Sequence, residues 1–204
     1  MKAFNSILIL VVASISFIVD AEDTIKEPLD CMNGSRLFGA SDGTDFSDWK
    51  QIDKLSKDHT LTKIKVCTDS ADRNVLGLQV TYGGYSAEGD ALEEVPLDSH
   101  GIVDEGVSRV VRCDERELGK GEYISKLEFG FTTEDLVTLA YQISGDDNPS
   151  EATFGEKGLD TLQTRPVTFS PNSIMFFGFN GRTSESNGQL RGLGIIGYDA
   201  LCVE

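Results

Sequence analysis

The chain has 204 residues, with 18 Lys and Arg against 34 Asp and Glu, which gives a net charge of −16 and a pI near 4.4. This length fits one domain with a short extension, and a hydrophobic content of 39% excludes a wholly disordered chain, a collagen and a multi-span membrane protein. The acidity argues against nucleic acids and anionic membranes as partners, because proteins bind both through clusters of Lys and Arg.

The N-terminal segment has the layout of a secretory signal peptide. Lys2 supplies a positive charge, Ile7–Val19 is apolar, and Ala21 precedes the expected cleavage site. An uncleaved anchor is the alternative, but the apolar run is short for a membrane span. We predict a signal peptide at 1–21, an N-terminal extension at 22–33, and secretion to the extracellular space or a secretory granule, with no membrane insertion after cleavage. Cleavage removes one Lys and one Asp, so the mature chain keeps the net charge of −16.

All four cysteines lie in the predicted mature chain. An even number of cysteines in a secreted protein favours two disulfides, for which three pairings exist. We favour Cys31 with Cys202, joining the two ends, and Cys67 with Cys113 inside the domain. No CxxC spacing occurs and histidines are scarce, so we predict no metal site and no cofactor. Asn33 begins an Asn-Gly-Ser sequon and is a candidate glycosylation site.

Beyond the extension, apolar and polar residues alternate with a period of two, which is typical of half-buried β-strands. The alternation is clearest at 61–67, 76–82, 123–131, 137–143 and 175–179. Turn-rich segments such as 82–90 and 144–150 separate these runs. Because no linker interrupts the pattern, we predict one all-β domain over 34–204, built as a sandwich or a prism.

A faint internal repeat adds a threefold pattern to this prediction. The segments 62–82, 125–143 and 174–198 each contain a strand, a polar loop and a second alternating strand. Three such hairpins would form three similar sheets around one axis, although any series of hairpins gives a similar pattern.

Five short motifs follow one another in a defined order. They are Gly39–Asp48, Leu76–Tyr82, Gly121–Ile124, Gly178–Arg182 and Leu193–Ile195. In their order and spacing they resemble the jacalin-related lectins, from about Arg36 to Tyr198. The resemblance implies a β-prism I fold of three Greek-key, four-stranded sheets with pseudo-threefold symmetry. It also implies non-catalytic binding of carbohydrate, with a glycan or glycoprotein as partner, and leaves a homo-oligomer open.

In that family, sugars bind at one end of the prism, between a glycine-rich first loop and a Gly-x-x-x-Asp loop near the C-terminus. Backbone amides and the aspartate carboxylate hydrogen-bond the sugar hydroxyls there. The resemblance therefore places a carbohydrate site on Gly39, Asp42, Gly43, Asn187, Gly188, Gln189, Leu190 and Arg191.

Arg191 stands where the family has its aspartate. A guanidinium donates hydrogen bonds and accepts none, so it cannot replace the carboxylate. Arg191 is able to bind an anionic sugar or to pair with a surface acid, and the second role is the commoner one. An open, amide-lined pocket around Arg191 would favour sugar binding. An ion-paired Arg191 would favour the alternative function, a structural acidic protein of granules or matrix that has kept the fold and lost the sugar site.

Enzymatic function has no signature in this sequence. A nucleophile elbow, a phosphate-binding loop, an HExxH motif and a dinucleotide fingerprint are all missing, so we predict no catalytic residues. His59 and His100 lie in polar segments, and we interpret both as exposed loop residues rather than general bases.

Two features have more than one interpretation. Asp42, Asp45 and Asp48 are spaced by three and offer oxygen ligands for calcium, as does the cluster at 145–148, but neither matches an EF-hand loop. Capping of turns by Asp and Asn is the simpler explanation for both. Trp49, the single tryptophan, is able either to stack on a sugar ring or to pack in the interior.

Overall fold

The computed structural model of the chain describes residues 32–35, 37–56, 58–86, 89–103, 111–132, 135–145, 149–156 and 163–199. The predicted signal peptide, the Cys31–Cys202 disulfide and the side chain of the predicted glycosylation site Asn33 lie outside the described residues, as does most of the 145–148 cluster. Within the described part, no helix has the length and apolar character that crossing a membrane requires.

These residues form β-structure almost throughout. The elements are β1 (Met32–Gly34), β2 (Phe38–Gly39), β3 (Thr44–Ser47), α1 (Trp49–Ile52), β4 (His59–Asp69), β5 (Val75–Tyr85), β6 (Ala91–Pro96), β7 (His100–Gly101), β8 (Val111–Glu117), β9 (Tyr123–Phe131), β10 (Leu136–Ser144), β11 (Ser150–Phe154), β12 (Gln163–Thr168), β13 (Ile174–Thr183) and β14 (Leu190–Asp199). All the strands predicted from the period-two alternation are present, each as the whole or a part of an observed strand.

The strands form three antiparallel sheets, two of which follow a Greek-key order. In one sheet, β9, β10 and β11 are consecutive neighbours and β12 returns beside β9, giving the order β11-β10-β9-β12. The order β6-β5-β4-β8 repeats this arrangement one unit earlier in the chain. These two units correspond to the first two copies of the repeat in the sequence.

The third sheet combines the two ends of the described chain. The hairpin of β13 and β14 is joined by β3 on one side and by β1 and β2 on the other. The sheet therefore contains the third copy of the repeat together with the N-terminal strands. This closure places the loop after β2 beside the C-terminal hairpin.

The predicted β-prism of three sheets is confirmed, with one addition. Two sheets contain a fifth strand, because one outer position in each is divided between two short strands, β1 with β2 and β6 with β7. At the first division the Ser35 hydroxyl accepts the N–H of Ile195 at 2.8 Å, so a side chain continues the hydrogen bonding of the sheet. At the second, Pro96 ends β6 and has no N–H to donate.

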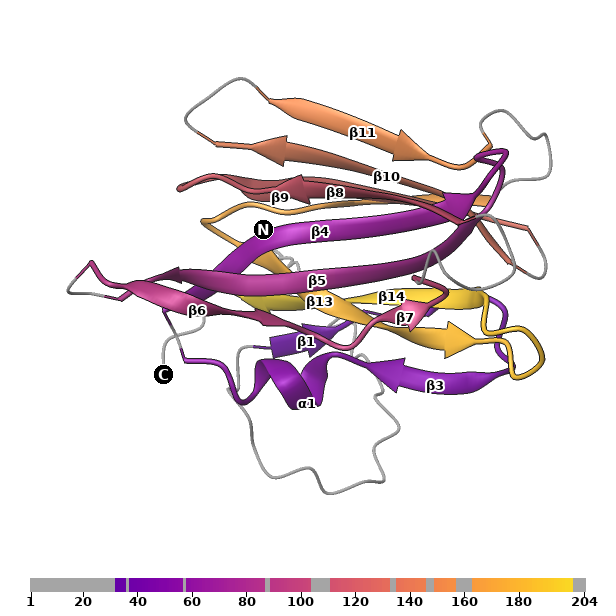
Figure 1. Cartoon of the computed structure of the whole chain (residues 1–204), viewed down its shortest axis with the longest axis horizontal. Coiled ribbons are helices and arrows are strands. Elements are labelled where there is room, and N and C mark those ends of the chain that lie inside the picture. The colour runs from indigo at the N-terminus through magenta and orange to yellow at the C-terminus, as the bar shows by residue number, and fades with distance from the viewer. Residues whose placement is uncertain are drawn as a thin grey trace, which may run out of the picture.

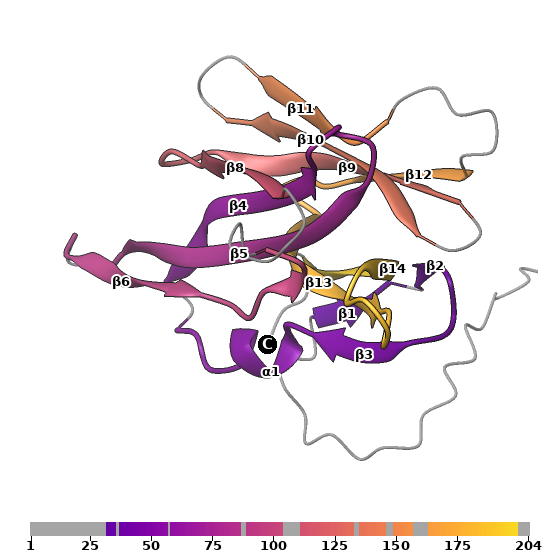
Figure 2. The same cartoon turned by 45° about the vertical axis from the view of Figure 1, so that its right-hand side comes forward.

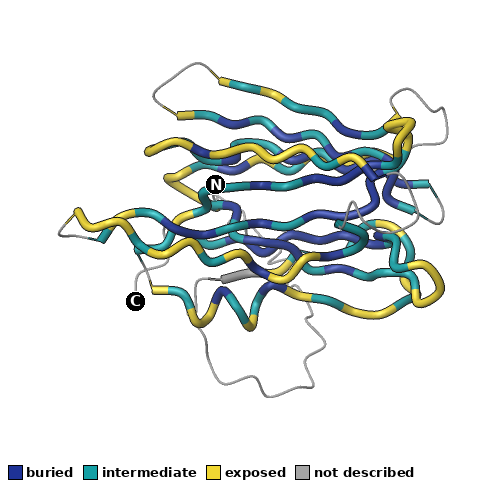
Figure 3. Tube along the Cα trace, in the orientation of Figure 1, coloured by how far each residue is buried: buried dark blue, intermediate teal, exposed yellow. Residues whose placement is uncertain are grey.

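Figures 1 and 2 show the arrangement of the three sheets, and their inner faces enclose the hydrophobic core. Ile64 and Val66 of β4, Leu127 and Phe129 of β9, and Phe179 of β13 are exposed by 1% or less. Figure 3 shows buried residues concentrated on the central strands and exposed ones on edges and loops. Each such side chain contributes about 1.5–3 kcal/mol through burial, so the shared core holds the sheets together.

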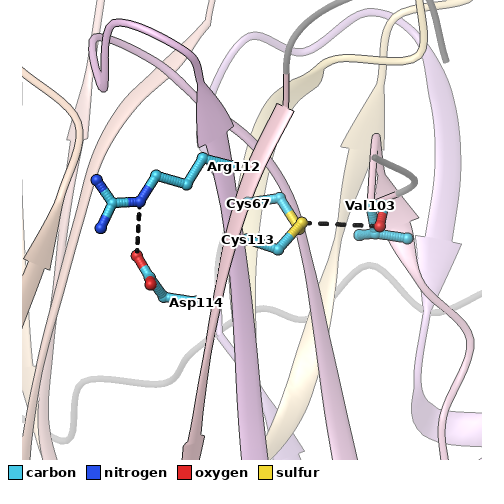
Figure 4. Close-up of a disulfide and its surroundings, with 5 residues drawn as sticks. All are labelled: Cys67, Val103, Arg112, Cys113 and Asp114. Atoms are coloured by element: carbon cyan, nitrogen blue, oxygen red, sulfur yellow. Dashed lines mark hydrogen bonds and ion pairs between the residues drawn. A yellow bond between two sulfur atoms is a disulfide. The ribbon is translucent and has the colours of Figure 1, made fainter. Parts of the chain in front are cut away.

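The Cys67–Cys113 disulfide is present and joins neighbouring strands (Figure 4). The two cysteines are direct partners in the register of β4 and β8, with Cα atoms 4.0 Å apart. The sulfur of Cys113 lies 3.7 Å from the carbonyl oxygen of Val103, and because a disulfide sulfur has no proton to donate, this is a packing contact. The bond therefore links β8 covalently to β4.

The short helix α1 follows β3 at the end remote from the first loop (Figure 1). Trp49 begins this helix and its partly buried side chain packs against the core. Packing is therefore the role that the structure gives the single tryptophan.

Candidate functional site

The two loops predicted to bind sugar meet at one end of the prism. The first loop, residues 40–43, joins β2 to β3, and the second loop, residues 184–189, joins β13 to β14 (Figure 2). The Ala40 N–H donates to the carbonyl oxygen of Arg191 at 2.9 Å. The guanidinium of Arg191 also donates to the Asp42 carboxylate at 2.6 Å. A backbone bond and an ion pair therefore connect segments from opposite ends of the described chain.

The first loop depends on two glycines. Gly39 and Gly43 have φ angles of +98° and +116°, a conformation that residues with a Cβ adopt only at a cost. A Cβ at Gly39 would collide with the carbonyl oxygen of Arg191 and come within 2.6 Å of the Phe131 ring. A Cβ at Gly43 would collide with the carbonyl oxygen of Thr183. Both glycines thus allow the first loop to approach the C-terminal hairpin closely.

The Arg191–Asp42 ion pair answers the question that the sequence left open at position 191. The Arg191 side chain is 22% exposed and that of Asp42 is 68% exposed. By our criterion, an ion-paired Arg191 favours the structural alternative at this position. The same pair brings the carboxylate of Asp42, from the first loop, beside Arg191, the residue that stands where the resemblance predicts an aspartate.

The second loop is held mainly by its own hydrogen bonds. The Asn187 amide donates to the Gln189 side chain at 2.6 Å and accepts the Gln189 backbone N–H at 3.0 Å. The backbone N–H of Gly188 donates to the carbonyl oxygen of Ser184 at 2.8 Å. Leu190 is fully buried in the core, so its side chain supports the loop from beneath. Of the predicted residues, Gly39 and Asp42 lie beside Arg191, and Gly43 lies against Thr183. Asn187 and Gln189 bond each other.

The three aspartates considered as calcium ligands each have a basic partner of their own. Besides Asp42 with Arg191, Asp45 accepts from the guanidinium of Arg182 at 2.6 Å, and Asp48 lies 2.5 Å from His100 Nε2. The described residues contain no group of three or more His, Cys, Asp or Glu side chains that could hold a metal ion. The spacing of three therefore corresponds to three separate pairings.

His100 is buried, so our interpretation of it as an exposed loop residue is wrong. It lies in β7, pairs with Leu78 of β5 in the sheet register, and is only 6% exposed. Its ring stacks on Phe46 with centroids 3.9 Å apart and an interplanar angle of 16°. The second oxygen of Asp48 accepts the backbone N–H of Phe179 at 2.8 Å. Polar neighbours in the sequence concealed this burial, which only the packing of two sheets produces.

Tyr82 belongs to the same buried region. Its hydroxyl donates to the carbonyl oxygen of Phe177 and so ties β5 to β13. Burial raises the pKa of Tyr82 well above its usual value of 10.0, and the negative charge of Asp48 raises it further. The Asp48–His100 pair likewise joins β7 to the segment between β3 and α1. Because the Asp48 and His100 side chains are 0% and 6% exposed, substrate cannot reach them, and they link two sheets.

A cleft of about 410 Å³ opens beside the first loop, and the sequence did not predict it. Its lining residues are Leu37, Phe38, Gly39, Phe131, Thr132, Gln163 and Arg165. The cleft lies between β2 of one sheet and β9 and β12 of another. It was missed because β12 is exposed at all but one position, so its sequence carries no alternation that would mark a strand.

Comparison with known proteins supports the fold assignment. No family profile matches the sequence, and no curated protein matches it. Among solved structures, AcmJRL, a mannose binding jacalin related lectin from Ananas comosus, is 17% identical, with a TM-score of 0.57 over 82% of this chain and 98% of the other. Malaysian banana lectin is 13% identical, with a TM-score of 0.55 over the same shares.

An animal protein shares the architecture as well. Lamprey immune protein is 19% identical, with a TM-score of 0.51 over 86% of this chain and 46% of the other. The chain thus has the fold of the jacalin-related lectins. At these identities the likeness concerns the fold, and the ligand has to be inferred from the residues of this chain.

Proposed function

We propose that this protein is secreted and binds glycans non-catalytically at the end of the prism that carries the first loop and the β13–β14 loop. The exposed carboxylate of Asp42 carries the proposal. It is 68% exposed at the end of the prism, held by Arg191 of β14, on a fold shared with lectins. The ion pair of Arg191 itself counts for the structural alternative, so the proposal rests on Asp42 and not on Arg191.

Asp42 acts as the acceptor of sugar hydroxyls in this proposal. One carboxylate oxygen accepts from Arg191, and a carboxylate has capacity for further hydrogen bonds on its second oxygen. Hydrogen bonds to an ionised acceptor are the stronger class, so one fixed carboxylate contributes much of the affinity for a neutral sugar. Arg191 then has a positioning role, because it holds the carboxylate in one orientation.

A glycan array at neutral pH, with calcium present, tests the proposal with a matched pair of variants. Asp42→Asn removes the charge at the proposed site. Asp45→Asn removes a carboxylate that is equally exposed, at 73% against 68%, and is also bonded to an arginine at 2.6 Å. We expect Asp42→Asn to weaken binding about tenfold or more, as loss of a charged hydrogen bond does, and Asp45→Asn to leave it unchanged. A blank array, or equal losses in both variants, would overturn the proposal.

A structural role is the second candidate, and the ion-paired state of Arg191 favours it. Here the acidic protein packs in granules or matrix, and calcium or protons relieve the self-repulsion of its net charge of −16. Light scattering should then rise during calcium or acid titration. A flat response across both titrations counts against this role.

A further inference from the structure

We propose that the cleft between β2, β9 and β12 binds the carboxylate of a terminal acidic sugar, such as a sialic or uronic acid, through Arg165. This inference rests on the proposed function and extends it to a ligand class. The cleft shares Gly39 with the first loop, so a glycan seated on that loop is able to extend one sugar into the cleft.

The position of Arg165 in the sheet is unusual. Cross-strand partners share a face, and Gln163 and Arg165 of β12 are paired with Phe131 and Phe129 of β9, which are 3% and 0% exposed. Their side chains therefore lie on the inward face of the sheet, where an apolar residue is the rule. Both are nevertheless exposed, because the cleft opens at this point. The fold thus presents a guanidinium and an amide on a face that elsewhere forms core.

Arg165 also differs from most of the described arginines in its partners. Within the described part of the chain, Arg112, Arg116, Arg182 and Arg191 each form an ion pair with an acidic side chain. Arg73 and Arg165 form none, and of these two only Arg165 lines the cleft. In a protein with 34 acidic residues, a guanidinium in a cleft without an acidic partner leaves positive charge available to an anion. Arg191, which the sequence offered for that role, is occupied by Asp42.

The lining of the cleft fits one sugar with one carboxylate. Its volume of about 410 Å³ lies within the usual range of small-ligand pockets, about 300–1,000 Å³. Leu37 and Phe38 supply apolar surface, Gln163 and Thr132 supply polar groups, and the planar guanidinium of Arg165 matches a carboxylate in bidentate geometry. Long polyanions are disfavoured, because the net charge of −16 repels every group that lies outside the cleft.

Protection of an edge strand is the competing explanation for Arg165. β12 is the outer strand of its sheet, and an inward-pointing charge on an edge strand prevents pairing with another chain. That role concerns solubility and has no effect on which sugar binds. The two explanations therefore separate when binding and aggregation are measured on the same variants.

The test is calorimetric titration of the full chain with matched sugars: methyl glucuronide against methyl glucoside, methyl galacturonide against methyl galactoside, and sialyllactose against lactose. The variants are Arg165→Gln and, as control, Arg112→Gln, which removes an arginine that is 69% exposed on β8, in the sheet that does not border the cleft. We expect the wild type and Arg112→Gln to prefer at least one acidic sugar over its neutral analogue by about tenfold, and Arg165→Gln to lose this preference while keeping its affinity for the neutral sugar.

Neutral binding without any acidic preference overturns this inference and leaves the proposed function standing. Acidic binding that depends on Arg165 but is unchanged in Asp42→Asn supports the cleft and overturns the role of Asp42. No binding of any sugar overturns both proposals. Aggregation of Arg165→Gln with an unchanged acidic preference assigns Arg165 to edge protection and overturns the inference.

Discussion

Two acid–base pairs from one short stretch of sequence lie in opposite environments. Asp42 pairs with Arg191 at the open end of the prism, where the two side chains are 68% and 22% exposed. Asp48 pairs with His100 between two sheets, where they are 0% and 6% exposed. Solvent screening makes an exposed pair worth about 0–1 kcal/mol, whereas loss of one partner of a buried pair leaves a polar group without its partner in the interior. The exposed pair is therefore open to solvent and to the ligand that we propose, whereas the buried pair links two sheets.

The largest expected effect is that of Asp48→Ala. This change removes the partner of His100 and the acceptor of the Phe179 N–H. Each buried group left without its hydrogen-bond partner costs about 1–3 kcal/mol, and the loss would be measured by urea unfolding monitored by tryptophan fluorescence. A loss below about 1 kcal/mol, as expected of an exposed pair, would remove the distinction between the two regions.

The backbone of the open end is the next most sensitive feature. Gly39→Ala places a Cβ against the carbonyl oxygen of Arg191 at a residue with a φ of +98°. Strain of this kind costs about 1–3 kcal/mol, so we expect lower stability by urea unfolding together with weaker glycan binding. That result would mean that the exposed site depends more on the close approach of the two backbones than on the charges of its side chains. Unchanged stability and binding would show that the first loop adjusts freely.

The buried region should also show a pH dependence at alkaline pH. The pKa of Tyr82 is raised above its usual 10.0 by burial and by Asp48, so the folded chain keeps a proton that the unfolded chain releases. The stability that this adds is complete below about pH 10 and is lost as the pH rises further. Tyr82→Phe should cost about 1 kcal/mol at neutral pH through the lost hydrogen bond to Phe177 and flatten the alkaline decline.

Tyr141 supplies the control for that measurement. Burial is the main cause that raises its pKa, with a smaller opposing effect from Arg116, so part of the alkaline decline should persist in Tyr82→Phe. The slope of the unfolding free energy against pH is the quantity to compare. If this slope above pH 10 is the same for Tyr82→Phe and the wild type, the proposed proton linkage is wrong.

The smallest effect on stability is expected for Arg191→Ala. Removing one partner of the exposed pair should change the unfolding free energy by less than about 1 kcal/mol, and added salt should shrink even that difference. Glycan binding should fall, because Asp42 loses the group that orients it. Urea unfolding at low and high salt, beside binding by calorimetry, separates the two outcomes. A stability loss as large as that of Asp48→Ala would show that the exposed pair contributes as much to stability as the buried pair does.

The sequence predicted those strands in which the alternation of apolar residues matches the face that is buried in the fold. Alternation over 76–82 and 123–131 predicted strands, because a strand with one buried face requires that period. The Cys67–Cys113 bond, which we favoured among the pairings that four cysteines allow, is present. β12 was missed, because an exposed edge strand bordering a cleft needs no apolar residues and carries no such signal.

The candidate site was predictable only in part, for a related reason. Glycines at 39 and 43 marked a loop of close approach, but the sequence did not show which acid would meet Arg191. His100 gave the opposite error: a polar neighbourhood in the chain concealed a position buried between sheets. The partners of charged residues depend on contacts between distant segments, and no periodicity of one segment encodes them.

The sequence by itself determined a strongly acidic all-β chain of threefold pattern, because composition and alternation are local properties. The tertiary structure decided where individual charges are used. Closure of the third sheet by both ends of the described chain set Asp42 against Arg191. Packing of that sheet on the sheet of β7 buried Asp48 with His100, and its opening toward the sheet of β9 and β12 left Arg165 in a cleft. Each outcome depends on distance and solvent exposure, which only the folded chain defines.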